Sequence, residues 1–268
     1  MTIRTITLKS LAAFSLVIFG CVPSPAGSQI SEGEKAVILS AARGKYYNLK
    51  QAGLLEFRAN IEPNWDALLP DTEARSTGRA LLNALHFSFS VDPQGQLRLE
   101  HHVDGAPSNQ KLAEGITRTF KGMDESISSF FRTWSIFLLT SPFPPAGSDY
   151  TIQKQANDYK FLQQQGELNV QVTTDNDFMI SEIRVTGPEL IASLRPVLEK
   201  TAGGFLLKGY TANSERLSGA RKTTVKALLE YETASGMQLL HKVSLDTVFQ
   251  GVPAKMEWLF TGYQLKLR

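Results

Sequence analysis

Few side chains in this sequence have the type and spacing that catalysis or cofactor binding requires. The chain contains one cysteine and four histidines. It has no Gly-x-Ser-x-Gly elbow, no His-Glu-x-x-His pair and no Gly-x-x-x-x-Gly-Lys loop, which are the clearest signatures of serine hydrolases, zinc proteases and phosphate-binding loops. We therefore predict a protein that is not an enzyme and has neither cofactor nor metal. An enzyme with dispersed catalytic residues is the remaining alternative.

The four histidines do not form an evident ligand set. His101 and His102 are neighbours on a predicted strand, so they point to opposite faces and cannot share a metal. His241 lies on the inward register of its predicted strand, where a lone histidine is more often a core residue than a ligand. His86 precedes a strand and has no identifiable partner.

Two acidic pairs have simpler interpretations than metal binding. Asp175 and Asp177 could suggest calcium, but calcium needs about six oxygen ligands, and these residues more simply favour a turn between two strands. Asp124 and Glu125 lie in the middle of a predicted helix and indicate a solvated face.

The only cysteine, Cys21, directly follows an apolar segment near the N-terminus. Arg4 and Lys9 precede Leu11–Gly20, an uncharged and mostly apolar run of ten residues. A membrane-spanning helix needs about 20 such residues, so the run is typical of a secretory signal instead. Ile18-Phe19-Gly20-Cys21 resembles a bacterial lipobox. The resemblance implies a signal peptide over 1–20, diacylated Cys21 as the mature N-terminus, and a tether over 21–29.

Two locations follow from alternative cleavage sites. No Asp follows Cys21, and in a two-membrane bacterium the family's sorting rule then implies a lipoprotein of the outer membrane that faces the periplasm. The alternative is cleavage after Ser24-Pro25-Ala26, which would leave Cys21 in the removed peptide and release a soluble periplasmic or secreted protein.

Composition limits the possible partners of the mature chain. The net charge of +2 is supplied by Arg4 and Lys9 in the signal, so the mature chain is close to neutral (+2 − 2 = 0). No cluster of basic residues offers a phosphate-binding footprint, and we predict no nucleic-acid partner. No second long apolar run occurs. Residues 30–268 have the length of one domain with a sizeable core.

Hydrophobic periodicity predicts helices followed by an extended run of antiparallel strands. We expect helices over 30–52, from Asp71, and over 108–139, a strand over 55–61, and a hairpin over 87–91 and 97–103. From residue 149 onward all segments alternate as strands, with a polar loop over 213–222. The apolar set shifts by one residue after Phe260, which indicates a β-bulge at Thr261-Gly262.

These elements predict an α+β fold: a strongly curved, unclosed antiparallel barrel of about 10–11 strands, with helices packed in its concave face. The element order, and the segment Gly203–Tyr210 (GGFLLKGY) in a late strand pair, resemble the lipoprotein-carrier fold of the LolA/LolB type. The segment Gly44–Lys50 (GKYYNLK) with Asn64-Trp65-Asp66 also resembles a group of secreted bacterial proteins without an assigned function. The carrier resemblance implies non-covalent binding of lipid or acyl chains.

The long helix becomes aromatic toward its C-terminal end, and this end is the candidate ligand site. We expect it to face the largest inward strand residues across a dry cavity, with Pro142–Gly147 as one rim of the mouth. The candidate ligand-binding residues are Phe130, Phe131, Trp134, Phe137, Leu245, Trp258 and Phe260. The same residues would equally serve as ordinary core, which favours the alternative function, a structural or interaction subunit of a cell-envelope assembly with a protein partner.

Overall fold

The computed structural model describes residues 30–68, 79, 81–92, 96–218 and 221–268. The predicted signal peptide, Cys21 and the tether lie outside these residues. So do the beginning of the helix predicted from Asp71 and the tip of the predicted hairpin at 93–95. Predictions for those segments stay predictions.

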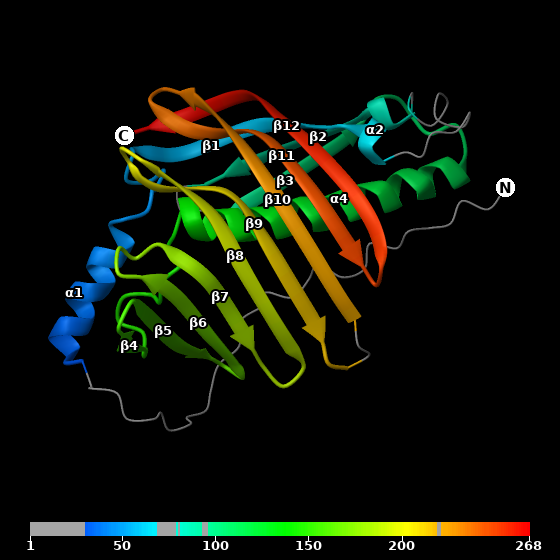
Figure 1. Cartoon of the computed structure of the whole chain (residues 1–268). Coiled ribbons are helices and arrows are strands. Elements are labelled where there is room, and N and C mark those ends of the chain that lie inside the picture. Colours follow the sequence, from blue (N-terminus) through cyan, green and yellow to red (C-terminus); the bar gives the residue numbers. More distant parts are fainter. Residues whose placement is uncertain (1–29, 69–78, 80, 93–95, 219–220) are drawn as a thin grey trace. The chain divides into compact units, whose positions relative to one another are not determined.

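The fold is α+β, with an antiparallel sheet that is not closed (Figure 1). The sheet has twelve strands in the order β3-β2-β1-β12-β11-β10-β9-β8-β7-β6-β5-β4. The fold class predicted from the sequence is therefore confirmed. The strands are β1 (Leu54–Pro63), β2 (Leu85–Val91), β3 (Leu97–Val103), β4 (Thr151–Gln155), β5 (Asp158–Gln165), β6 (Leu168–Asp175), β7 (Ile180–Thr186), β8 (Leu190–Thr201), β9 (Gly204–Arg216), β10 (Arg221–Ala234), β11 (Met237–Phe249) and β12 (Val252–Leu267).

The helices whose bounds fall within the described residues are α1 (Glu32–Arg43), the short α2 (Trp65–Leu68) and α4 (Gln110–Leu138). Within the described part of the chain, no helix combines the length and hydropathy needed to cross a membrane. Contacts divide the described chain into two compact units. Unit 1 comprises Gly53–Ser135 and Met256–Arg268, and unit 2 comprises residues 30–52 and Ile136–Lys255. The expectation that 30–268 is a single domain stays a prediction.

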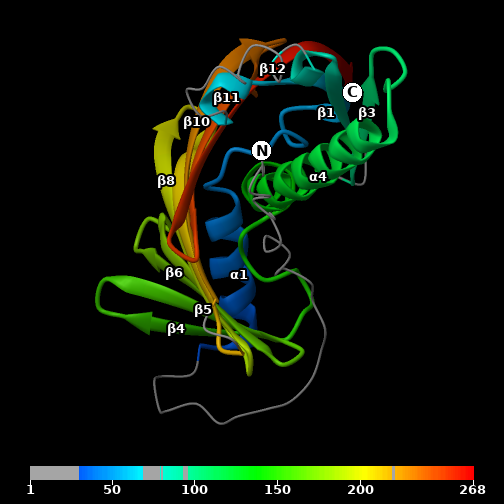
Figure 2. The same cartoon turned by 90° about the vertical axis from the view of Figure 1, so that its right-hand side faces the viewer.

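Unit 1 is a four-strand segment of sheet with most of α4 packed on one face (Figure 2). Strand β1 lies between β2 and β12, so that Ile61 pairs with both Phe87 and Phe260. Helix α4 begins where the side chain of Asn109 accepts a hydrogen bond from the Leu112 N–H at 2.9 Å. Its boundaries confirm the predicted helix to within two residues at the start and one at the end.

The predicted bulge in the last strand is present. Between the pairs Arg58–Gln264 and Asn60–Thr261, β12 contains one residue more than β1. Gly262 adopts a φ of 64°, the left-handed conformation that glycine supplies in this type of bulge. Met256, Trp258 and Phe260 are buried before the bulge, and Tyr263 continues the apolar set after it. The extra residue therefore keeps the apolar side chains on one face.

Unit 2 contains β4 to β11, each paired antiparallel with the next, and the helix α1 (Figure 2). Ser31 caps α1 by accepting from the Glu34 N–H at 3.4 Å. The helix ends at Arg43, so the prediction that it continues to Ala52 is wrong. The reason is tertiary: the Phe205 N–H donates to the Lys45 carbonyl at 2.7 Å, and the Tyr47 N–H donates to Phe205 at 3.0 Å.

Two strand predictions in unit 2 also need correction. The polar loop predicted over 213–222 is largely strand, because β9 continues to Arg216 and β10 begins at Arg221. Cross-strand pairs between polar residues, such as Asn213 with Thr224, give these strand ends a stable exposed face. Strand β4 lies within the region predicted as strands, but its own bounds were not predicted, because only Ile152 of its five residues is buried.

Candidate functional site

The predicted aromatic site is a cluster of closely packed rings inside unit 1. Phe131 is its centre, with ring centroids 4.5 Å from Phe89, 5.5 Å from Trp134 and 5.9 Å from Phe260. Phe130 contacts Trp258 edge to face at 5.8 Å. Each of these candidate residues is at most 2% exposed. Edge-to-face contacts at these distances are typical of a filled protein core.

The close packing of these rings indicates that five of the predicted site residues form core. Phe130, Phe131, Trp134, Trp258 and Phe260 lie together in unit 1, between α4 and the strands it covers. Their assignment as ligand-lining residues stays a prediction, but their geometry is that of core. The indole N–H groups of Trp134 and Trp258 are buried and have no hydrogen-bond partner among the described residues.

Phe137 and Leu245, the other two predicted site residues, belong to unit 2. Both are buried, at 2% and 3% exposure. The Phe137 ring lies 6.4 Å from the ring of Tyr46, a residue that joins several segments of unit 2. Tyr46 in turn lines a pocket in unit 2.

A pocket of about 520 Å³ opens in unit 2 beside the proline-rich segment after α4. Its volume lies within the range of small-molecule sites. One wall is the predicted rim segment, including Pro142 and Phe143, and the other is the chain that follows α1. The lining residues are Arg43, Tyr46, Asn48, Gln51, Thr140, Ser141, Pro142, Phe143, Pro145 and Ala146.

Hydrogen bonds hold the two walls of this pocket together. The Leu49 N–H donates to the Leu138 carbonyl at 2.9 Å, and the Asn48 amide donates to the Thr140 carbonyl at 3.1 Å. The Asn48 side-chain oxygen in turn accepts from the N–H groups of Lys50 and Gln51. The pocket wall is therefore fixed by main-chain groups and by the side chain of Asn48, although most of it lies outside helix and strand.

Tyr46 lines the pocket and is only 4% exposed. Its hydroxyl donates to the Phe178 carbonyl at 2.9 Å and accepts from the Ile180 N–H at 2.8 Å. Its ring packs edge to face on Phe143 and Phe205 at 5.5 Å. Burial raises the pKa of Tyr46 far above the ordinary value of tyrosine, since the charged phenolate would lose its hydration.

Arg43, at the end of α1, supplies positive charge at the pocket. Its Nη2 donates to the carbonyl of Pro144, while its Nε is buried without a hydrogen-bond partner among the described residues. Desolvation lowers the pKa of Arg43, partly opposed by Tyr150, but a guanidinium stays charged in proteins. A partly dehydrated guanidinium that lines a pocket is suited to a carboxylate or phosphate.

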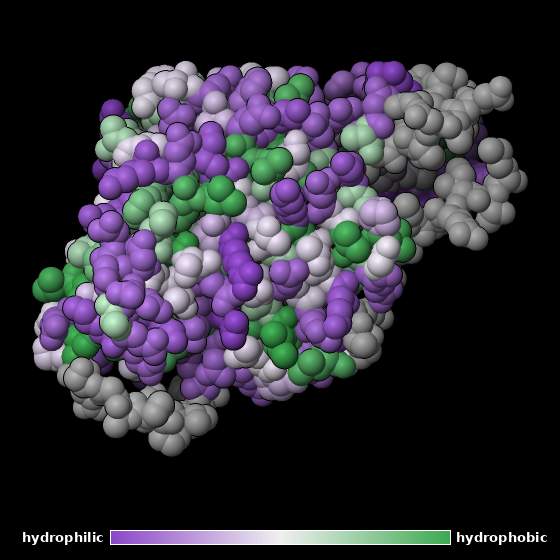
Figure 3. All heavy atoms as spheres, in the orientation of Figure 1, coloured by the Kyte–Doolittle hydropathy of each residue, from purple (hydrophilic) through white to green (hydrophobic). Residues whose placement is uncertain are grey.

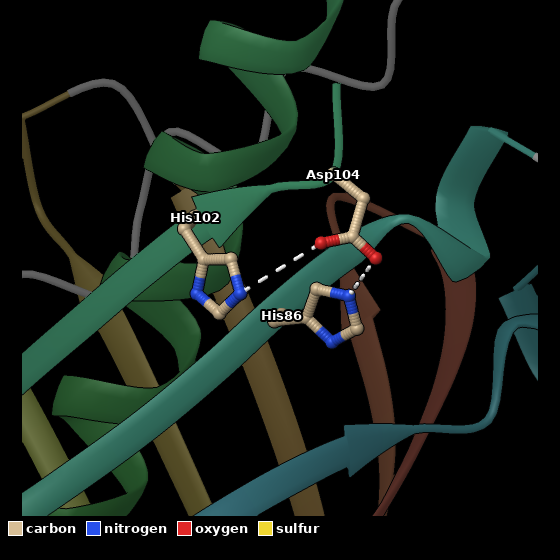
Figure 4. A group of neighbouring side chains, drawn as sticks. All are labelled: His86, His102 and Asp104. Carbon is tan, nitrogen blue, oxygen red and sulfur yellow. Dashed lines mark hydrogen bonds and ion pairs between the residues drawn. The ribbon is translucent and has the colours of Figure 1, made fainter.

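A second group of chemically active side chains lies on the β2–β3 hairpin of unit 1 (Figure 4). The Nε2 of His86 lies 2.8 Å from Oδ2 of Asp104, and the Nε2 of His102 lies 3.9 Å from Oδ1 of the same carboxylate. The two imidazole rings are stacked with centroids 4.7 Å apart. These residues could hold a metal ion.

The structure confirms some predictions for the other titratable residues. His101 and His102 do face different groups: His101 stacks on Phe120 of α4 at 4.0 Å, away from the His86–His102 stack. The Asp175 carboxylate accepts from the N–H groups of Asp177 and Met179, each at 2.9 Å, which confirms the predicted turn.

Three predictions about such residues are wrong. His241 is exposed, with its Nδ1 3.5 Å from Glu232, because β11 contains an extra residue where its register against β10 shifts. Asp124 is half-buried beside His101 rather than solvated. His86 lies within β2 and has Asp104 as its partner.

The hairpin register was the signal that could have located the histidine cluster. Val91 pairs with Leu97, and counting away from the turn along both strands places His86 directly opposite His102. Asp104 follows His102 by two residues and so shares its face. The pocket had a weaker signal, because its walls meet only through contacts between segments distant in sequence.

Comparison with protein-family models, with curated proteins and with solved structures gives no match for this chain.

Proposed function

We propose that the chain is an exported, membrane-tethered binding protein that takes a lipid or acyl chain with an acidic end group in the unit 2 pocket. The observation that supports this function is the composition of the pocket wall. Phe143 and the neighbouring prolines provide apolar surface, and the guanidinium of Arg43 provides a positive charge. An amphiphile satisfies both parts of such a wall.

The experiment compares lipid binding by the wild-type chain and by Arg43→Gln. Native mass spectrometry of protein purified from membranes should reveal co-purifying lipid, and titration with palmitate should give saturable binding. Because hydrogen bonds to charged groups contribute about 1.5–3 kcal/mol, Arg43→Gln should weaken palmitate binding at least about tenfold.

Arg132→Gln is the matched control, since it removes the same charge from an exposed position on α4. It should bind palmitate like the wild type. Equal loss in both variants, or full retention in Arg43→Gln, would place the ligand outside this pocket. If the wild type neither retains lipid nor binds palmitate, the function itself is contradicted.

The alternative function, an interaction subunit of a cell-envelope assembly, is favoured by apolar side chains on an exposed sheet face. Val197 on β8 and Leu228 on β10 both pair with Gly209 on β9 between them, and they are 56% and 52% exposed. Figure 3 shows apolar groups scattered among polar ones over these strands. An envelope protein that cross-links to the wild type but not to Leu228→Lys, with palmitate binding unchanged, would favour this alternative.

The proposal includes no catalytic turnover. Assays with common ester, peptide and phosphate substrates should give no activity. Hydrolysis that a single substitution abolishes would contradict this part of the proposal.

A further inference from the structure

The three side chains of the hairpin cluster lie on one face of the β2–β3 hairpin. His86 and His102 are directly opposite each other in the antiparallel pairing. Asp104 lies two residues after His102, and its N–H donates to the Ala84 carbonyl at 2.9 Å, which continues the ladder past the end of β3. Since alternate residues of a strand share a face, the backbone itself directs all three side chains to the same place.

The donor atoms of this cluster are already close together (Figure 4). One nitrogen from each imidazole and one carboxylate oxygen all lie within 4.8 Å of one another. A tetrahedral zinc ion at about 2.0–2.1 Å from each nitrogen would require donor separations of roughly 3.3 Å. The donor atoms therefore need to approach one another only slightly, and rotation of the side chains is sufficient for this.

The exposure of the cluster allows that rotation. The side chains of His86, His102 and Asp104 are 44%, 71% and 66% exposed. They are therefore accessible to a hydrated ion and free to adjust their χ angles. Asp104 now accepts a hydrogen bond from His86, and a bound cation would take the place of that proton between the two side chains.

We propose that His86, His102 and Asp104 form a binding site for a divalent transition-metal ion of the zinc class. Two imidazoles and one carboxylate suit Zn²⁺, Ni²⁺ and Cu²⁺, whereas Ca²⁺ and Mg²⁺ prefer oxygen ligands alone. Three protein ligands leave the fourth position of a tetrahedral ion to water or to a donor from another molecule. The site belongs to unit 1 and does not depend on the proposed lipid pocket.

Titration calorimetry of the purified chain with Zn²⁺, without a histidine tag, tests this site. We expect one ion per chain. Loss of an outer partner of a metal ligand typically weakens binding about 10–100-fold, so removal of a ligand itself in His86→Ala or His102→Ala should cost at least about tenfold. Asp104→Asn should also weaken binding, because it removes the ligand's negative charge.

His101→Ala is the matched control, because its neighbour His102 is in the cluster while His101 itself stacks on Phe120. His241→Ala, in unit 2, is a second control. Both should bind Zn²⁺ like the wild type, and circular dichroism should show that all variants fold. The absence of Zn²⁺ binding, or equal affinity in wild type and His102→Ala, would overturn the proposal.

A spectroscopic measurement makes the test independent of affinity. With Cu²⁺ as probe, electron paramagnetic resonance of the wild type should show hyperfine coupling to two imidazole nitrogens. The His86→Ala spectrum should show one. Identical spectra for these two proteins would also overturn the assignment.

Discussion

At the scale of single residues, Tyr46 connects three parts of unit 2. It follows α1, pairs through its backbone with Phe205, and holds Phe178 and Ile180 through its hydroxyl. The hydroxyl uses its proton for the bond to the Phe178 carbonyl, so ionisation would remove this bond and place a charge in the core. The raised pKa of Tyr46 therefore has a consequence for stability in alkali.

We predict that the wild-type chain loses stability above about pH 10, the ordinary pKa of tyrosine. The folded protein keeps its Tyr46 proton where the unfolded chain has lost it. The stabilising contribution is thus complete below pH 10 and falls as the pH rises, by up to about 1.4 kcal/mol per pH unit. Urea denaturation between pH 7 and 11 measures this slope.

Tyr46→Phe should remove that contribution to the slope and lower stability at neutral pH by about 1–3 kcal/mol, because the Ile180 N–H loses its acceptor. Burial also raises the pKa of Tyr47, so Tyr47 contributes a second part of the loss of stability in alkali. Tyr47→Phe measures that part. An alkaline slope in Tyr46→Phe as steep as in the wild type would contradict the prediction.

Phe131 is the residue whose truncation should damage unit 1 most clearly. It contacts four aromatic rings and is 2% exposed. We predict that Phe131→Ala lowers the free energy of unfolding by about 3–5 kcal/mol, with Phe131→Leu as a milder control. Chemical denaturation measures both. A loss below about 1 kcal/mol in Phe131→Ala would mean that the cluster is not a packed core.

At the scale of elements, the bulge in β12 depends on the conformation of one glycine. Gly262 has a positive φ, and a Cβ on it would approach the Asn60 amide to 3.1 Å. We predict that Gly262→Val destabilises the fold by about 1–3 kcal/mol, and that Gly262→Asn costs less, because asparagine tolerates this conformation. Thermal and urea unfolding compare the two variants. Equal stability of Gly262→Val and wild type would contradict this account of the bulge.

The elements also show what periodicity can and cannot predict. Helix α4 and the β2–β3 hairpin were predictable because their apolar residues recur over many positions, and the bulge because the alternation shifts at one identifiable point. The end of α1 was not, since Ala41 to Leu49 keep a helical pattern while main-chain bonds from Phe205 hold that segment in another conformation. The prediction that His241 points inward is wrong because the extra residue in β11 interrupts the alternation of inward and outward side chains along that strand.

Some residues of the candidate sites were predictable from the sequence and others were not. The aromatic cluster and its burial were predictable from the stripe on α4. Pro142–Gly147 was expected to form the rim of a cavity at that cluster, whereas Pro142, Phe143 and Pro145 line the separate pocket of unit 2. Arg43 was not identified, because nothing in the sequence places α1 beside Pro144, a residue 101 positions later. The cluster of His86, His102 and Asp104 was predictable from the register of the β2–β3 hairpin.

At the scale of the whole molecule, the proposed function requires attachment to a membrane through Cys21. We predict that Cys21→Ser converts a protein that detergent extracts from the membrane fraction into one that is unprocessed or released. Cell fractionation, with metabolic labelling by a fatty acid, measures this. A wild-type protein that is already soluble, with Gly27 or a later residue at its N-terminus, would contradict the prediction. That result would favour the alternative, cleavage after Ala26.

The pairing of β1 with β12 determines the order in which unit 1 can be completed. Leu54 pairs with Leu267, so β1 and β12, the first and last of the described strands, are neighbours. The entropy of closing so long a loop is lost before these contacts form, which slows folding. During synthesis, one side of β1 keeps its backbone groups unpaired until β12 has been made. A nascent chain of this protein therefore exposes an unpaired strand edge over that interval, and such edges pair readily with other chains.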